Sequence, residues 1–120
     1  MAEYKTIGQS MQDNLIAGDF PIVTKGITIA TGQILKRGAL LGRVQASGKY
    51  LLSLAGANNG SENPVAILGA DVDATSGDIE SVCYFSGQFN TTALTFGTGH
   101  TATSAAHILR ILNIYLTETV

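Results

Sequence analysis

Two apolar stretches near the middle of the chain show its clearest strand pattern. The first, Val65 to Ala70, is a short uninterrupted apolar run that follows Pro64 and ends before Asp71. The second, Ile79 to Phe89, is apolar on both parities at its centre. Runs of this length between turn residues are typical of buried strands. We therefore predict a central β-ribbon formed by these two stretches and one polar turn, with apolar layers on both sides.

Glycines divide the preceding segment, Pro21 to Val44, into short pieces. Ile27 and Ile29 alternate there with Thr28 and Ala30, which is the pattern of a half-buried strand. Short strands separated by glycine turns indicate a compact, strongly bent β-structure.

Turn residues then place a hairpin and a surface loop. Ser47-Gly48 lies between two strand-like arms, which predicts a hairpin with Val44 opposite Leu51. The stretch from Ala55 to Pro64 is rich in Asn and Gly and is expected to be a surface loop. Gly87, inside the second central stretch, predicts a bulge, a bend or a close approach of the backbone.

Near the C-terminus the period changes to that of a helix. We predict a helix over Ser104–Leu112 with Thr103 as its N-cap and an extended segment over Asn90–Phe96 before it. Asn113 is expected to end the helix in the left-handed conformation, and Ile114–Leu116 to form a closing strand. The apolar stripe of this helix has i, i+3, i+4 and i+7 spacing and consists of Ala105, Ile108, Leu109 and Leu112.

The first residues, Met1 to about Phe20, carry scattered large apolar side chains without a strand or helix period. An extended segment of this kind costs about 1–2 kcal/mol of backbone entropy per residue to order, so we expect it to stay mobile until a partner supplies pairing and burial. The predicted organisation is therefore an N-terminal arm over residues 1–20 and one domain over residues 21–120. The fold class is mostly β with one short C-terminal helix.

Composition favours a protein that works in an assembly. Charged residues make up 13% of the chain, roughly half the share of about 25% found in ordinary soluble proteins. A net charge of -2, with Lys36-Arg37 as the only basic pair, argues against nucleic acid as a partner. A single cysteine cannot form an intramolecular disulfide. The chain shows no leader-like start and no apolar run of membrane-spanning length, so we expect a soluble compartment and no membrane partner.

Two stretches resemble ligand-binding loops without meeting their requirements. Gly97 to Ala102 matches G-x-G-x-x-A, but too few residues follow for the parallel strands of a dinucleotide fold. Asp71 to Thr75 begins like a calcium loop, yet Ser76 stands where the turn requires glycine and Val82 where the bidentate carboxylate belongs. We expect neither a nucleotide nor a metal site, and no cofactor.

The nucleophilic and basic residues also lack a catalytic pattern. Cys83 lies mid-strand among apolar neighbours, which predicts a small buried hydrophobic side chain rather than a nucleophile paired with His100 or His107. No G-x-S-x-G elbow is present. We therefore predict no enzymatic activity.

Two other classes remain open from the residues alone. The glycine-punctuated strands are similar to those of biotinyl and lipoyl carrier domains, for which Lys36 and Lys49 are the candidate modified lysines. A minor structural subunit of a larger assembly, such as a tail or baseplate, would share the assembly-prone composition.

Taken in order, five segments resemble the head decoration proteins of lambda-type tailed bacteriophages. The resemblance runs from about Phe20 to Tyr115, and the order and spacing of the pieces are more specific than any one piece. The segments are GQILKRGALLGRV, SGKY, NGSENPVAILGADVDA, VCYFSGQFNTTALTFG and AHILRILNIYL.

This resemblance implies a small mixed β domain of the β-clip type that assembles as a homotrimer on the outside of the expanded capsid. It further implies a non-enzymatic protein that is made in the host cytoplasm, binds the major capsid protein of the same phage and stabilises the head against internal DNA pressure. The arm would contact the capsid through Glu3, Tyr4, Lys5, Thr6, Ile7, Met11, Leu15 and Phe20. The expected trimer-contact loops contain Asn58, Asn59, Glu62, Gly97 and His100.

Overall fold

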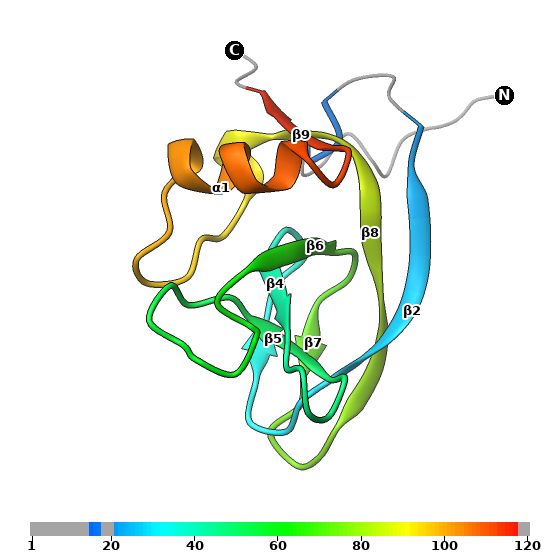
Figure 1. Cartoon of the computed structure of the whole chain (residues 1–120). Coiled ribbons are helices and arrows are strands. Elements are labelled where there is room, and N and C mark those ends of the chain that lie inside the picture. The colour runs from blue at the N-terminus through cyan, green and yellow to red at the C-terminus, as the bar shows by residue number, and fades with distance from the viewer. Residues whose placement is uncertain (1–14, 18–20, 118–120) are drawn as a thin grey trace, which may run out of the picture.

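β8 (Ile79–Asn90) is the longest strand, and the other strands are arranged around it (Figure 1). The computed structural model describes residues 15–17 and 21–117. In it, β8 pairs antiparallel with β2 (Val23–Ile29) and β6 (Pro64–Leu68), and parallel with β9 (Ile114–Thr117). The second stretch singled out by the sequence is therefore the centre of the fold.

The main sheet closes on itself. Its strand order is β2-β5-β4-β6-β8-β9, in which β4 spans Leu40–Arg43 and β5 spans Tyr50–Leu52. Because β2 also pairs with β8, the strands from β2 to β8 form a small barrel, and β9 is added outside it. β3 (Ile34–Leu35) and β7 (Val72–Asp73) form a separate two-stranded sheet. The mostly β fold with one short helix near the C-terminus is confirmed.

Two hydrophobic cores lie on opposite sides of the β6–β8 pair. The barrel core lies inside the closed sheet, and the helix core lies between that sheet, α1 (Ala102–Arg110) and β9. The barrel core consists of Ile27, Ile29, Leu35, Ala39, Leu41, Ala66, Leu68, Val72, Ala74 and Cys83. The helix core consists of Leu15, Leu40, Ile67, Phe89, Ala105, Leu109 and Ile114.

A bulge lets β8 serve both cores. The register between β2 and β8 shifts next to Val23, where Phe85 is the extra residue on β8. One extra residue reverses which side chains face which side of a strand. Cys83 and Phe89 are both odd-numbered, yet Cys83 lies in the barrel core and Phe89 in the helix core. Tyr84, which precedes the bulge, packs in the helix core together with Phe89, with ring centroids 5.4 Å apart.

Gly87 is required by a close contact. Its φ is 144°, and a Cβ at this position would lie 2.9 Å from the ring of Phe89. The predicted close approach is confirmed, while the bulge itself falls two residues earlier, at Phe85.

The two central stretches do pair, as β6 with β8, but two details of the expected strand pairing were wrong. The connection between the central stretches is not a simple polar turn, because β7 lies within it and pairs with β3. β8 also pairs along most of its length with β2 and meets β6 only through Tyr84 and Cys83.

The Ser47-Gly48 hairpin is present, but Leu51 lies opposite Gly42 instead of Val44. The turn is longer than a two-residue loop, since Val44 and Lys49 close it with a 2.8 Å hydrogen bond.

The helix starts and ends two residues earlier than expected. Thr101 is the N-cap instead of Thr103, and it forms a capping box with Ser104. Because the helix ends at Arg110, Leu112 is left 40% exposed instead of buried. Asn113 has a φ of 67°, which confirms the left-handed stop, and β9 confirms the closing strand.

The expected extended segment before the helix is interrupted. A short 3-10 helix, η2 (Thr91–Ala93), follows β8 directly. Asn90 caps it by accepting a hydrogen bond from the Thr92 N–H at 3.2 Å. The side chain that ends the strand thus starts the turn.

Candidate functional site

The two loops expected to make trimer contacts lie side by side. The His100 Nε2 atom is 3.0 Å from the Ser53 hydroxyl and 3.1 Å from the Glu62 carbonyl oxygen. The Ser53 hydroxyl donates its own proton to the Ser61 carbonyl at 2.7 Å. Both neighbours of Nε2 are therefore acceptors, so we assign the imidazole proton to Nε2. His100 ties the loop before α1 to the loop before β6.

Polar side chains hold the second of these loops in shape. The Asn59 side-chain oxygen accepts from the Ser61 N–H at 3.0 Å, and Glu62 Oε1 accepts from the Gly60 N–H at 2.9 Å. Asn58 is exposed. Hydrogen bonds within the loop therefore hold its backbone in place, and Asn58 lies exposed on its surface.

Gly97 contributes to this region through its backbone. It is buried, and a Cβ there would lie 2.0 Å from the Ser53 carbonyl oxygen. The Ala55 N–H donates to the Thr98 oxygen at 3.0 Å, which joins the two loops again. Gly97 is thus needed for the approach of the loops to each other.

Of the residues expected in the arm, Leu15 alone lies within the described residues. Glu3, Tyr4, Lys5, Thr6, Ile7, Met11 and Phe20 lie outside them. Leu15 is fully buried in the helix core, and its carbonyl oxygen accepts from the Asn90 N–H at 2.7 Å. Ala17 donates to the Gln88 oxygen at 2.9 Å. The segment 15–17 therefore packs on β8 as part of the domain.

The residues proposed for chemistry are engaged in the fold. Burial raises the pKa of the Cys83 thiol to about 11, against a weaker opposite effect of the Lys25 charge. The interpretation of Cys83 as a buried hydrophobic side chain is confirmed. Asp71 accepts from the Arg37 N–H at 2.8 Å, and Asp73 from the Thr75 N–H at 3.1 Å. Both carboxylates of the calcium-like stretch thus hold turns.

The candidate carrier lysines both lie near carboxylates. Lys49 Nζ is 2.6 Å from Asp78 Oδ2, whereas the more exposed Lys36 is 3.9 Å from Asp71. Within residues 15–17 and 21–117, no group of three or more His, Cys, Asp or Glu side chains could hold a metal ion. The same ranges contain no helix long and apolar enough to cross a membrane.

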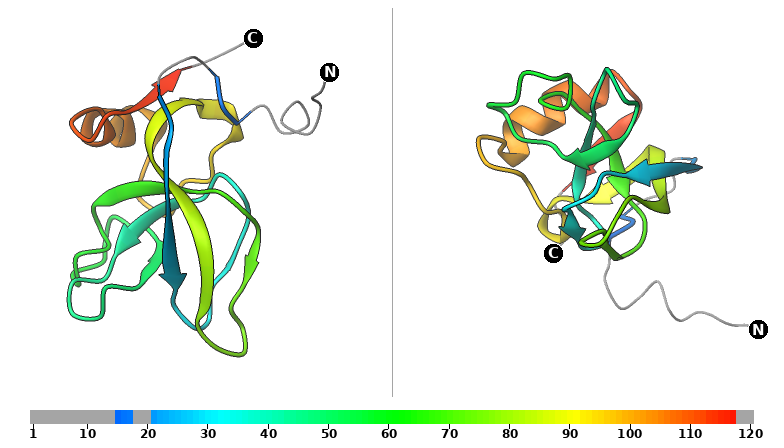
Figure 2. Two further views of the ribbon diagram at one scale, coloured as in Figure 1. Left: turned by 90° about the vertical axis from the view of Figure 1, so that its right-hand side faces the viewer. Right: turned by 90° about the horizontal axis from the view of Figure 1, so that it is seen from below.

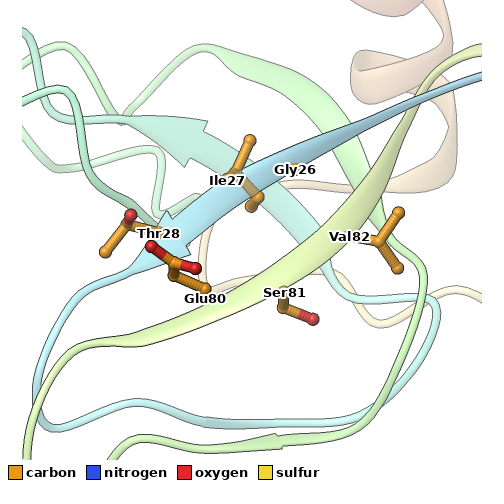
Figure 3. Close-up of a pocket in the computed structure, with 6 residues that line it drawn as sticks. All are labelled: Gly26, Ile27, Thr28, Glu80, Ser81 and Val82. Carbon is orange, nitrogen blue, oxygen red and sulfur yellow. The ribbon is translucent and has the colours of Figure 1, made fainter.

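A shallow depression of about 560 Å³ lies over the β2–β8 pair. It is lined by Gly26, Ile27, Thr28, Glu80, Ser81 and Val82 (Figure 3). Thr28 and Glu80 lie beside each other at one end, and Val82 lies at the other (Figure 3). The lining offers one carboxylate and two hydroxyls without a histidine or lysine beside them, so it holds no nucleophile and base pair.

Sequence reasoning missed an aromatic and cationic cluster beside this depression. The rings of Tyr50 and Phe85 meet edge to face, with centroids 6.3 Å apart. Lys25 Nζ lies 5.8 Å from the Phe85 centroid, and Arg43 is opposite Tyr50 in the β4–β5 register. These residues come from four different strands, so no local spacing in the sequence could have grouped them.

Comparison with known protein families gives a match over most of the chain. The model described as Bacteriophage lambda head decoration protein D matches residues 4–114 of the 120-residue chain. No curated protein sequence matches the chain. The family match includes the two joined loops, both cores and most of the expected arm.

Proposed function

The chain belongs to the family of bacteriophage lambda head decoration protein D, and we propose that it acts as a trimeric clamp on the expanded phage head. Membership of this family of structural capsid proteins implies association with the phage capsid, on the exterior of the virion. The finer proposal is that homotrimers bind the major capsid protein of the same phage. They would stabilise the head, without catalysis, against the internal pressure of DNA. The family match over residues 4–114 is the observation that carries this proposal.

Stabilisation follows from selective binding. A protein that binds the closed, expanded lattice and not opened or unfolded subunits shifts the equilibrium towards the lattice by mass action. Three arms on one trimer strengthen the effect, because docking of the first raises the effective concentration of the others.

The arm is proposed to add a strand to a sheet edge of the shell. The buried Leu15 supports a role of the arm as a link between shell and domain, because it fixes the end of the arm to the helix core. A pull on residues before Leu15 would be transmitted to β8 through the hydrogen bonds of Leu15 and Ala17. Tyr4 and Ile7 would supply apolar burial on the shell.

The trimer is proposed to form through the joined loops, at Asn58, Asn59, Glu62 and the segment Gly97–His100. Their mutual hydrogen bonds support this proposal, since a preorganised loop loses less entropy on association.

Co-sedimentation with expanded heads that lack this protein tests the clamp. The full chain should bind saturably, in multiples of three copies per site, and a variant beginning at Asn14 should lose binding. The truncation keeps Leu15, because its removal would also damage the helix core. Absence of binding by the full chain would refute the capsid clamp, and unchanged binding by the truncated variant would refute the role of the arm.

Point variants separate apolar burial from arm length. Tyr4→Ala with Ile7→Ala should weaken binding, whereas Gln9→Ala should leave it unchanged. Equal binding by all of these variants would contradict apolar anchoring by Tyr4 and Ile7.

A further inference from the structure

β2 has an open edge along its first half. The Val23 N–H points towards β8 and donates to the Ser86 side-chain hydroxyl at 3.1 Å, while the Ala30 N–H donates to the Tyr50 carbonyl on the opposite side at 2.9 Å. Because backbone polar groups alternate along a strand, the N–H and C=O groups of Thr24 and Gly26 face away from β8.

No described strand covers this edge. β5 meets β2 at Ile29 alone, and every residue from Val23 to Gly26 is exposed. In the left-hand view of Figure 2, β8 (yellow-green) runs beside β2 (blue) and crosses it. An edge of unpaired backbone groups is a template for one more strand.

The surface beside this edge has a defined chemistry. Tyr50 and Phe85 are half-buried and meet edge to face, and Lys25 lies over the Phe85 ring. Neither Lys25 nor Arg43 has an ion pair with a carboxylate among the described residues. An extended segment with apolar side chains on one face and an acidic residue near its middle would satisfy both the aromatic floor and the two cations.

The charges beside this edge and the proposed function together indicate whose segment this is. Lys25 and Arg43, without carboxylate partners among the described residues, favour an acidic occupant. The shell protein is the partner that the proposed function brings to this face. Pairing of two β2 edges from two copies would instead create a twofold dimer, which does not build a threefold assembly.

We infer that the Val23–Gly26 edge of β2 accepts an extended, acidic segment of the capsid shell protein by strand addition, an inference that rests on the proposed function. The decoration protein then takes part in strand pairing through its folded domain as well as through its arm.

Gly26 offers a matched pair of variants. Gly26→Pro removes the N–H that faces the open edge, while Gly26→Ala keeps it. A Cβ at this position would have the Ser81 carbonyl oxygen as its single close neighbour, at 3.9 Å. Proline is tolerated where the missing N–H faces the outside of an edge strand. Circular dichroism and thermal melting verify that both variants fold.

The binding experiment uses expanded heads that lack this protein. Gly26→Pro should bind at least about tenfold more weakly than Gly26→Ala, because an edge hydrogen bond to the shell is lost. Equal binding by the two variants, with normal binding by the full chain, would overturn the edge inference and leave the capsid clamp intact. Failure of the full chain itself to bind would refute the proposed function and, with it, the shell as occupant.

Charge variants give an independent result if Gly26→Pro does not fold. Lys25→Gln and Arg43→Gln should each weaken binding and reduce its salt dependence, whereas Lys36→Gln, at an exposed lysine that lies near Asp71, should not. Equal effects of all three variants would overturn the inference. So would a changed oligomeric state of Gly26→Pro in the absence of heads, which would show that the edge joins copies of this chain.

Discussion

The two cores of this domain are built from different parts of the chain. All side chains of the barrel core come from the stretch between Ile27 and Cys83. The helix core instead joins Leu15 to α1 and β9 on the face of β8, so it requires both ends of the domain. The barrel core thus takes its side chains from the middle of the chain, whereas the helix core next to the arm brings distant segments together. Forces on the arm therefore act first on the helix core.

The cores also differ in how their polar groups are satisfied. The buried Asn90 belongs to the strand end that the helix core covers, and its Nδ2 atom has no hydrogen-bond partner within the described part of the chain. A buried donor without a partner costs about 1–3 kcal/mol. Hydrogen bonding of buried polar groups is thus less complete beside the helix core than in the barrel core. The helix core is also the one to which the arm is attached, through Leu15.

Phe89→Ala should have the largest effect, because it removes the largest side chain of the helix core. Phe89 is fully buried and packs against Tyr84. Truncation of a buried Phe costs about 3–5 kcal/mol in the free energy of unfolding. Urea denaturation measures the loss, and Phe89→Leu should retain most of the stability. A loss below about 1 kcal/mol would mean that the helix core adds little to the fold.

Leu15→Ala should have the next largest effect, and it isolates the root of the arm. Loss of a fully buried leucine is expected to cost about 2–4 kcal/mol. Amide hydrogen exchange should accelerate most at Asn90 and Ala17, whose N–H groups bond across this contact. Ile16→Ala, at a half-buried neighbour, is the matched control. Unchanged exchange at Asn90 would show that segment 15–17 is not held by the Leu15 side chain.

Cys83→Ser tests the barrel core with a change of one atom. A buried hydroxyl without a partner costs about 1–3 kcal/mol, so the variant should lose stability while Cys83→Ala loses less. In the wild-type protein the raised thiol pKa, about 11, and full burial predict slow alkylation near neutral pH. If the helix core opens first, exchange at Asn90 should be faster than alkylation of Cys83. Faster alkylation of Cys83 would show instead that the barrel core opens first.

Local patterns predicted the features that depend on neighbouring residues. The alternation of Ile27 and Ile29, the turn at Asn113 and the closing strand after it are all set within a few residues. The helix start was missed by two residues because Thr101 and Thr103 are both good caps, and the capping box with Ser104 favours the first.

Long-range pairing was beyond the reach of sequence patterns. The bulge at Phe85 depends on the register with β2, more than fifty residues earlier, and it decides which core receives Phe89. The closure of β2 on β8 is of the same kind. For the candidate site, glycine and asparagine content correctly located the loop between Ala55 and Pro64. The junction of this loop with the one before α1, through His100 and Ser53, could not be foreseen, because it spans 47 residues.

Asp78→Asn, at the exposed end of the barrel, should have the smallest effect, and the size of this effect should depend on pH. Hydrogen bonds from Lys49 and then Thr31 lower the Asp78 pKa from 3.8 to about 2. Since the folded state binds this proton more weakly than the unfolded state, the carboxylate contributes stability above pH 3.8, and the contribution is lost as the pH falls towards about 2. The variant should therefore be slightly less stable than the wild type at neutral pH, and the difference should vanish in acid. Thermal melts of both proteins from pH 7 to pH 2 measure it. A difference that persists at pH 2 would show that the Asp78 charge is not its cause, and would attribute it to the geometry of the turn.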